Sequence, residues 1–316
     1  MDGFLNVHKP AGLTSHDVVQ RIRKWSREKR VGHGGTLDPT ATGVLPVALG
    51  YGTRLLEFLT GPKIYQGQIE FGTSTDSYDA AGSVLERRDT SGLSRSQVET
   101  SLAGYVGELL QQPPLFSAVK YRGKPLYYYA RRGIPAVALP RRVTVSRISL
   151  LAWEPPIAVV EVECSRGTYV RSLAHDVGQS LGCGAYLKAL VRVRDGMFAI
   201  EESITLSDLE TAFQEQTIGA FLYPLDAPIR DWPAVTLPPS RDREVLDGKA
   251  LLQDSHDVTL PEAETPGIQA PSGGGSPHCR AYSADGKLLA LLEYQPENAS
   301  WHPFKVFPRK PTADIL

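Results

Sequence analysis

One acidic residue stands out among the residues that could do chemistry, because the chain around it is rich in glycine and proline. Asp38 lies in the segment Gly-His-Gly-Gly-Thr-Leu-Asp-Pro-Thr-Ala-Thr-Gly over residues 32–43. Glycine and proline at this density exclude a regular helix or a central strand, so the segment is a shaped loop. Pro39 biases the backbone of Asp38 toward extended geometry, which fixes the direction of the carboxylate. A carboxylate held in this way can act as a nucleophile or as a general base.

The loop alone does not distinguish such a role from an Asp-Pro turn whose carboxylate faces solvent. It is not a phosphate-binding P-loop, because no Gly-Lys-Ser/Thr sequence follows the glycines. Asp76 and Asp79 lie in a segment rich in Ser and Thr, where we expect local turn hydrogen bonds rather than a glycosidase pair. The three cysteines, Cys164, Cys183 and Cys279, have neither a disulfide nor a zinc spacing, so no metal site is expected.

The elements that must position this loop can be read in part from capping signals. Residues 14–17 and 94–97 are capping boxes that each predict the start of a helix. Residues 157–164 have the apolar pattern of a strand, and the turn that follows leads to Thr168 as the expected N-cap of a further helix. Short strands and helices alternate irregularly, which predicts an α+β fold with a large sheet rather than a regular βαβ array.

Two segments depart from this order. Residues 111–142 are rich in Pro, Tyr and Arg and have weak periodicity, so we expect an insertion that protrudes from the fold. Residues 259–277 are rich in Pro, Gly and Ser, and we expect them to be disordered. They interrupt a C-terminal part in which Asp285-Gly286 predicts a hairpin. We therefore expect a large domain over 1–230 and a small β-rich domain over 231–316.

The net charge of −1 hides an uneven distribution along the chain. Residues 1–200 hold 25 Lys and Arg against 17 Asp and Glu, a balance of +8, whereas residues 201–316 hold 9 against 18. Residues 109–153 contain eight basic side chains and no acidic one. Such a local field attracts a polyanion even when the whole protein is nearly neutral. The charge pattern therefore favours contact with nucleic acid over a merely solvated surface.

The loop around Asp38 resembles the catalytic signature of the TruB family of tRNA pseudouridine-55 synthases, which reads G-H-x-G-x-L-D-P-x-A-x-G. Further similar segments follow in order within residues 4–200, namely 6–15, 72–82, 112–114, 117–120, 129–131 and 167–171. The C-terminal part is more loosely similar to the PUA-type RNA-binding domain that often follows. The resemblance implies the pseudouridine synthase fold: α+β, with a large mixed, mainly antiparallel sheet flanked by helices and loops, a thumb-like insertion and a PUA-like domain.

The chemistry implied by this resemblance needs little from the protein. Isomerisation of uridine to pseudouridine breaks the N1–C1′ bond, turns the detached base and joins C5 to C1′. No redox step occurs and no group is gained or lost overall, so no cofactor is needed and one carboxylate suffices. The resemblance implies Asp38 in this role, whether as nucleophile or as base. It also implies that Arg171 pairs with Asp38 and keeps it ionised, although by itself Arg171 is equally compatible with a surface position.

The resemblance also implies a set of side chains around the base. The target base must leave its stack, which costs a few kcal/mol, so the protein must supply a pocket. By the family pattern, His33 lies beside the extruded base, Tyr65 stacks on the uracil, and Tyr169 and Leu190 line the pocket. Taken alone, His33 fits a loop hydrogen bond better and Tyr65 fits core packing better, whereas for Leu190 core packing fits nearly as well as the pocket.

The insertion carries interleaved basic and aromatic side chains. Basic side chains neutralise phosphates and tyrosines stack on unpaired bases. The resemblance implies a thumb that closes over the T stem-loop of tRNA; the alternative is a loop without function. The basic residues are Lys120, Arg122, Lys124, Arg131, Arg132, Arg141 and Arg142, and the tyrosines are Tyr121, Tyr127, Tyr128 and Tyr129.

These observations predict a cytoplasmic, monomeric enzyme that acts on tRNA without an obligatory protein partner. No stretch approaches the about 20 apolar residues of a membrane span, and the N-terminus lacks the pattern of a signal peptide. Two other classes stay open. One is an RNA chaperone that binds RNA without chemistry, and the other is a guide-RNA-dependent synthase of the archaeal and eukaryotic kind, which shares the same core.

Overall fold

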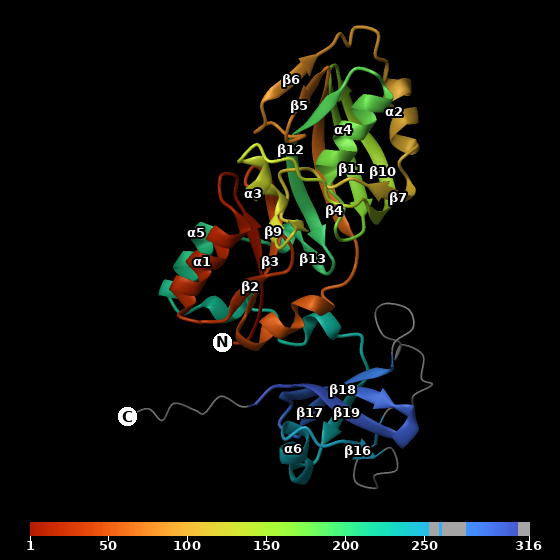
Figure 1. Cartoon of the computed structure of the whole chain (residues 1–316). Coiled ribbons are helices and arrows are strands. Elements are labelled where there is room, and N and C mark those ends of the chain that lie inside the picture. The colour runs from red at the N-terminus through yellow and green to blue at the C-terminus, as the bar shows by residue number, and fades with distance from the viewer. Residues whose placement is uncertain (253–258, 261–275, 309–316) are drawn as a thin grey trace. The chain divides into compact units, whose positions relative to one another are not determined.

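The computed structural model describes residues 1–252, 259–260 and 276–308 (Figure 1). The expectation of disorder over 259–277 falls mainly on residues 261–275, which lie outside the described residues. Within the described ranges, no helix has the length and apolar character needed to cross a membrane. The chain divides into two compact units. One comprises Leu5–Val47 and Gly61–Phe221, and the other comprises Met1–Phe4, Ala48–Thr60 and Leu222–Leu316.

A ten-stranded sheet organises the first part of the chain, in the order β14-β1-β3-β12-β4-β11-β10-β7, with β2 paired to β3 and β13 to β12. The β1–β14 and β3–β12 pairs are parallel, whereas β12, β4, β11, β10 and β7 pair antiparallel in succession. This confirms the expected large mixed, mainly antiparallel sheet. The strands are β1 (Gly3–Lys9), β2 (Val31–His33), β3 (Thr42–Leu49), β4 (Lys63–Phe71), β7 (Gly107–Gln111), β10 (Arg141–Glu154), β11 (Ile157–Cys164), β12 (Ala185–Asp195), β13 (Phe198–Ala199) and β14 (Ile204–Thr205).

The central strand β4 shows how the sequence assigns the two faces of this sheet. Its side chains alternate in burial, with Tyr65, Ile69 and Phe71 directed inward and Gln66 and Gln68 exposed. This is the period of two expected of a strand with one buried face. Because β4 pairs with both β11 and β12, its inward side chains are held from two sides. Tyr65 is therefore fixed on the inner face.

The helices begin largely where their capping signals predict. Helix α1 (Ser15–Ser26) starts after the Thr14–Asp17 capping box, and α2 (Arg95–Ala103) after the Ser94–Gln97 box, which confirms both predictions. The prediction of Thr168 as an N-cap is wrong. Helix α4 (Val170–Ser180) begins after Tyr169, which gives no side-chain cap. The Thr168 hydroxyl instead donates to the backbone carbonyl of Ser165 at 2.9 Å, within the preceding turn.

The predicted insertion leaves and returns to the sheet at paired residues, since Gln111 on β7 lies opposite Arg141 on β10. It contains a small hairpin and a short helix with a core of their own (Figure 1). The core consists of Val119, Leu126, Ala136 and Ala138, against which Tyr121, Tyr129 and Tyr169 pack. The elements are β8 (Lys120–Tyr121), β9 (Lys124–Pro125) and α3 (Leu126–Ala130).

The C-terminal part forms a five-stranded sheet in the order β15-β17-β18-β19-β16. The hairpin predicted at Asp285-Gly286 joins β17 to β18, and Gly286 adopts the left-handed φ of +76° that the turn requires. A β-rich C-terminal domain is thus confirmed, while its start at residue 231 stays a prediction. Its elements are β15 (Ala234–Leu237), α6 (Pro239–Leu246), β16 (Leu251–Leu252), β17 (His278–Ser283), β18 (Leu288–Gln295) and β19 (Ser300–Val306).

The remaining elements are short. Strands β5 (Thr73–Thr75) and β6 (Val84–Arg87) form a separate hairpin, and α5 (Leu206–Gln214) follows β14. Five 3₁₀ segments complete the described elements: η1 (Gly50–Phe58), η2 (Ile200–Glu202), η3 (Ile218–Phe221), η4 (Ala227–Ile229) and η5 (Pro296–Asn298).

Candidate active site

The loop that carries Asp38 connects β2 to β3 and is anchored by the segment that follows β1. Ser15 and Leu37 exchange two hydrogen bonds, with the Leu37 amide 2.8 Å from the Ser15 hydroxyl. The ammonium of Lys9, which is fully buried, donates to the carbonyls of Leu13 at 2.6 Å and Pro39 at 3.3 Å. These contacts fix the backbone on both sides of Asp38. The loop is therefore a rigid support, as its glycine and proline content predicts.

Arg171 holds the Asp38 carboxylate with two nitrogens. Its Nε lies 2.9 Å from Oδ2 of Asp38, and its Nη2 donates to Oδ1 at 3.1 Å. The Arg171 side chain is only 4% exposed, whereas that of Asp38 is 32% exposed. The carboxylate is thus held by Arg171 on its buried side and is accessible to solvent on the other side. A fork of this kind fixes both the position and the orientation of a carboxylate.

Two opposing influences act on the protonation of Asp38. Burial raises the pKa of this carboxyl above its ordinary value, and the nearby charge of Asp79 acts in the same direction. The Arg171 guanidinium and the Lys9 ammonium oppose them. Since the net direction is upward, Arg171 limits the rise in pKa rather than bringing it below the ordinary value.

Asp79 belongs to the same network, which reasoning from the sequence missed. The local turn bonds predicted for it exist: Ser77 donates to its Oδ1 at 2.5 Å and the Ala81 amide does so at 3.0 Å. Its other oxygen, however, accepts from Nη1 of Arg171 at 3.3 Å. Arg171 therefore bridges Asp79 and Asp38. No local signal marks a partner 92 positions away, although the resemblance over 72–82 included this residue.

His33 and Tyr65 lie close to a group of buried charges behind the loop. Tyr65 is 7% exposed and lies opposite Arg192 in the β4–β12 pair. Burial raises the pKa of Tyr65 to about 12. His33, at the end of β2, is half-buried, and burial followed by the charge of Arg192 lowers its pKa. Both side chains are thus neutral at physiological pH and available for contact with an uncharged base.

Tyr169 and Leu190 are placed differently from each other. Tyr169 is the N-cap residue of α4, where its side chain provides no cap and its backbone amide donates to Oε1 of Gln111 at 2.7 Å. Its ring packs on the core of the insertion. Leu190 is half-buried on β12 opposite Gly67 of β4. Tyr169 therefore links the insertion to the helix that carries Arg171.

In the insertion, the tyrosines already have partners within the chain. The ring of Tyr128 has the Lys124 ammonium 4.3 Å from its centroid and the Arg132 guanidinium 3.8 Å from it. Arg131 lies 5.4 Å from the centroid of Tyr127. These cation–π contacts hold exposed basic groups in place. The stacking of these tyrosines on bases stays a prediction.

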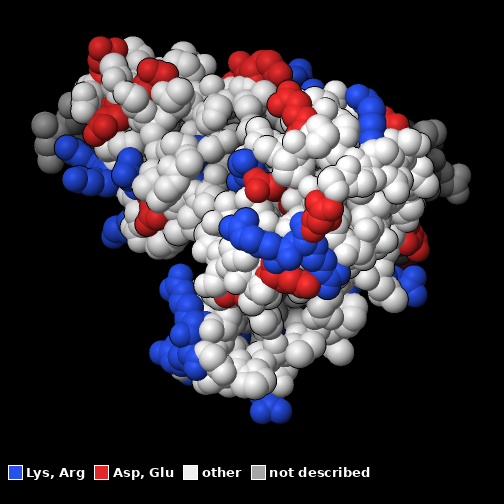
Figure 2. Space-filling view, turned by 90° about the horizontal axis from the view of Figure 1, so that it is seen from above, with Lys and Arg blue, Asp and Glu red and all other residues white. Residues whose placement is uncertain are grey.

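The other basic residues predicted to bind RNA also lie within the insertion over residues 111–142. Lys120 is exposed on β8, and Arg141 and Arg142 are exposed at the start of β10. Arg142 also lies 3.7 Å from the Glu108 carboxylate, but both side chains are largely exposed, so the pair contributes little. Figure 2 shows Lys and Arg side chains in several separate patches on the face that it displays, one of them beside acidic side chains.

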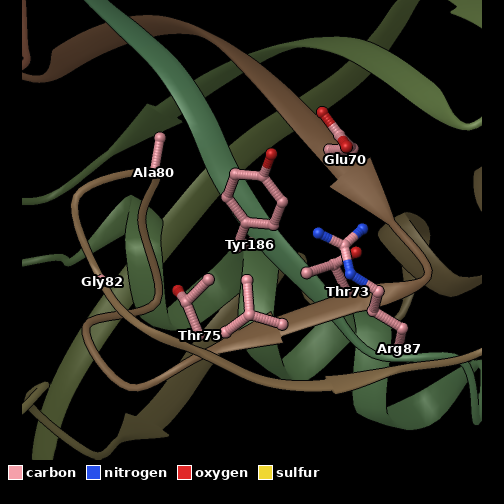
Figure 3. A pocket seen from close by; sticks show the side chains of 8 residues that line it. Glu70, Thr73, Thr75, Ala80, Gly82, Arg87 and Tyr186 are labelled. Carbon is pink, nitrogen blue, oxygen red and sulfur yellow. The ribbon is translucent and has the colours of Figure 1, made fainter.

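A small pocket lies apart from these residues. Glu70 from β4, Arg87 from β6 and the Tyr186 ring from β12 surround it (Figure 3). Because residues 65 and 70 are an odd number of positions apart on β4, Glu70 points away from the face that carries Tyr65. This pocket is therefore not the base site. Among the described residues, no group of three or more His, Cys, Asp and Glu side chains could hold a metal ion.

Two family models match adjoining parts of the chain. The TruB family pseudouridylate synthase N-terminal domain matches residues 23–170, and the tRNA pseudouridylate synthase B C-terminal domain matches residues 171–230. A tRNA pseudouridine synthase B of Dehalococcoides mccartyi is 42% identical over 312 residues, 98% of each chain. One of Synechocystis sp. is 45% identical over 255 residues, 80% of this chain and 86% of that relative.

Solved structures show the same fold. A chain of a Cbf5-Nop10-Gar1 complex has a TM-score of 0.68 at 28% identity and covers 97% of this chain and 84% of its own. A chain of an H/ACA RNP bound to a substrate RNA containing 2′-deoxyuridine has a TM-score of 0.68 at 24% identity, with 98% and 86% covered. The predicted pseudouridine synthase fold is confirmed. The family models, the relatives along nearly the whole length and this fold establish that the chain is an isomerase belonging to the TruB family of pseudouridylate synthases.

Proposed function

We propose that the chain converts the uridine at position 55 in the T loop of tRNA to pseudouridine, with Asp38 as the catalytic carboxylate and without a cofactor. The observation that carries this proposal is the two-nitrogen grip of buried Arg171 on Asp38, inside a loop whose other side is open. The relatives named tRNA pseudouridine synthase B support tRNA as the substrate.

In this mechanism the target uridine leaves the stack of the T loop and enters the site. Tyr65 stacks on the uracil, and His33, Tyr169 and Leu190 complete the surroundings of the base. Such contacts replace the stacking that the base loses in the RNA. The sugar then lies against Asp38, which is the one group of this set with a carboxylate to offer.

The reaction is the same in outline for either role of Asp38. As nucleophile, the carboxylate attacks C1′; as base, it removes the proton from C2′. In both cases the N1–C1′ bond breaks and its electron pair stays with the uracil. The base turns and C5 bonds to C1′, while Asp38 either leaves C1′ or returns its proton to C2′. C5 then loses its proton and N1 gains one. Arg171 orients the carboxylate for these steps, and Asp79 orients Arg171.

The insertion provides the contact to RNA outside the reacting nucleotide. Lys120, Arg131, Arg132, Arg141 and Arg142 neutralise phosphates of the T stem-loop. The cation–π contacts of Tyr127 and Tyr128 support this role, because they restrict the positions of Arg131 and Arg132 before RNA binds.

The chain acts as a cytoplasmic monomer on tRNA alone in this proposal. The likeness to chains of H/ACA assemblies favours one further candidate, a synthase that needs a guide RNA and protein partners. The match to Dehalococcoides mccartyi tRNA pseudouridine synthase B over 98% of both chains supports the stand-alone reading.

One experiment tests the function directly. The purified chain is incubated with an unmodified T stem-loop RNA, and pseudouridine is mapped along the product. We expect one pseudouridine, at the position corresponding to 55, with no guide RNA present. Absence of pseudouridine, or pseudouridine spread over several uridines, contradicts the proposal. Product that forms only after a guide RNA is added favours the second candidate.

A further inference from the structure

Four charged side chains gather behind the loop that carries Asp38. We call Lys63, Arg166, Arg192 and Asp195 the cation cluster. The Asp195 carboxylate lies 3.1 Å from Nζ of Lys63, 3.2 Å from Nη1 of Arg166 and 3.5 Å from Nη1 of Arg192. The side chains of Lys63, Arg192 and Asp195 are 8%, 0% and 1% exposed, and that of Arg166 is 38% exposed.

This cluster is bonded to the backbone of the loop itself. Arg192 donates to the carbonyl of Gly35 at 3.1 Å and to that of Val44 at 2.7 Å, and Arg166 donates to the carbonyl of Gly34. A Cβ on Gly35 would lie 2.5 Å from Nζ of Lys63, so the Lys63 ammonium lies directly against the backbone of the loop.

The cluster also reaches the side chains that the proposed function places around the uracil. Tyr65 lies opposite Arg192 in the β4–β12 pair, and it lies two residues after Lys63 on the same face of β4. The positive charges of Arg192 and Lys63 add to burial in lowering the pKa of His33. Their field therefore extends to the region that the base would occupy.

The charges in the cluster do not balance. Three cations share Asp195, which is the one carboxylate that forms an ion pair with any of them in the described part of the chain. The net charge is +2 while Lys63 is protonated. Removing charge from water is costly, so a buried group with excess positive charge lowers the stability of the fold. Negative charge that develops nearby during a reaction would interact favourably with this excess.

We propose that the cation cluster stabilises the negative charge that develops on the uracil as the N1–C1′ bond breaks. This inference rests on the proposed function, but not on the choice between nucleophile and base for Asp38. In both cases the bonding electron pair leaves with the base and spreads over N1, O2 and O4. Fixed cations in a poorly solvated site act strongly on such charge and need no reorganisation during the reaction. Lys63, Arg166 and Arg192 act through space, without touching the reacting atoms.

The first test removes one charge and compares it with a matched control. Lys63→Met removes a cation from a group with excess positive charge, so the fold is expected to persist. Lys188→Met makes the same change on the opposite face of the sheet, where Lys188 is exposed and pairs with Glu70 at 2.8 Å. We expect Lys63→Met to lower the single-turnover rate about tenfold with unchanged affinity for a T stem-loop RNA, and Lys188→Met to leave the rate unchanged.

The second test separates stabilisation of charge from a purely structural role. The same RNA is prepared with 5-fluorouridine at the target position, and loss of the starting nucleotide is followed in a single turnover. Fluorine withdraws electrons and makes the departing base a more stable anion. A variant with fewer positive charges should therefore lose more of its rate with the uridine RNA than with the 5-fluorouridine RNA. A variant whose loop is misplaced should lose the same factor in rate with both RNAs.

Arg166→Met provides a second variant, because this side chain is partly exposed and its loss disturbs the core less. We expect Arg166→Met, like Lys63→Met, to lower the rate with the uridine RNA more than the rate with the 5-fluorouridine RNA. Equal slowing of both substrates in both variants overturns the inference and leaves the cluster a structural support. No slowing in either variant overturns it as well, and so does loss of folding and RNA binding in both. If instead the wild-type chain forms no pseudouridine, the proposed function itself fails.

Discussion

Asp38 depends on residues distant in sequence for both its position and its charge. Burial works against its ionised form, and Arg171 is the main group that opposes this effect. Arg171 in turn is held by Asp79 at 3.3 Å and by the carbonyl of Phe116 at 3.0 Å. At the scale of single residues, the site is therefore a chain of buried contacts that ends in one accessible carboxylate.

The acid limb of the pH–rate profile should report this balance. Asp38 must be ionised to act, so activity is lost as the pH falls through its raised pKa. Arg171→Met removes the main opposing cation, which raises the pKa further and moves the limb to higher pH. Arg171→Lys keeps the charge without the fork, so its limb should move less. A limb at the same pH in wild type and Arg171→Met would show that Arg171 does not tune Asp38.

Asp79 should matter through Arg171 rather than through contact with RNA. We expect Asp79→Asn to lower kcat about tenfold, the equivalent of one charge-assisted hydrogen bond, with tRNA affinity retained. Asp76→Asn is a matched control in the same loop, since Asp76 accepts from the Ser83 amide at 2.9 Å and takes no part in the Arg171 network. Rate measurements that give equal losses for the two variants contradict this role.

At the scale of elements, the sequence predicts those parts whose signals are local. The capping boxes at 14–17 and 94–97 and the strand at 157–164 appear where expected, because capping and alternation depend on neighbouring residues. The N-cap at Thr168 does not, since its hydroxyl bonds within the preceding turn. No local pattern predicts that Asp195 gathers Lys63 from β4 and Arg166 from the turn after β11 beside Arg192 of its own strand, because the first two contacts exist only in the folded sheet.

The insertion between β7 and β10 carries the prediction that belongs to this scale. Replacement of Arg131, Arg132, Arg141 and Arg142 by Ala should weaken tRNA binding and flatten its dependence on salt, because fewer counterions are then released. Binding is measured over a series of salt concentrations. An unchanged slope would mean that the insertion does not contact phosphates.

A matched set of substitutions makes this comparison quantitative. Four exposed basic residues outside the insertion can be replaced by Ala to remove the same total charge, and a smaller change in the salt slope is expected for them. An equal change would indicate a diffuse effect of net charge instead of a local contact. The control residues are Lys24, Arg88, Arg95 and Arg243.

At the scale of the whole molecule, the uneven charge along the sequence agrees with the proposed location of catalysis and RNA contact in the first 200 residues. The acidic balance falls on residues 201–316, and the basic balance falls on the part that contains Asp38 and the insertion. The sequence predicts the α+β class and the β-rich C-terminal domain from local patterns, and the resemblance adds the pseudouridine synthase fold. Neither predicts the grouping of Ala48–Thr60 with the C-terminal residues, because that grouping depends on packing between distant segments.

The whole chain should act without other macromolecules. Purified protein and full-length unmodified tRNA transcript should suffice for modification, and sedimentation should show one chain per particle. A requirement for a guide RNA, or activity confined to a larger assembly, would place the chain with the guide-dependent class.

The most direct test of the central claim is pseudouridine formation by Asp38→Asn on unmodified tRNA transcript, measured beside wild type together with tRNA affinity. The substitution keeps the size of the side chain and removes its charge. We expect no pseudouridine from the variant and a tRNA affinity within about tenfold of wild type. Equal pseudouridine formation by the variant would contradict the assignment of Asp38 as the catalytic carboxylate.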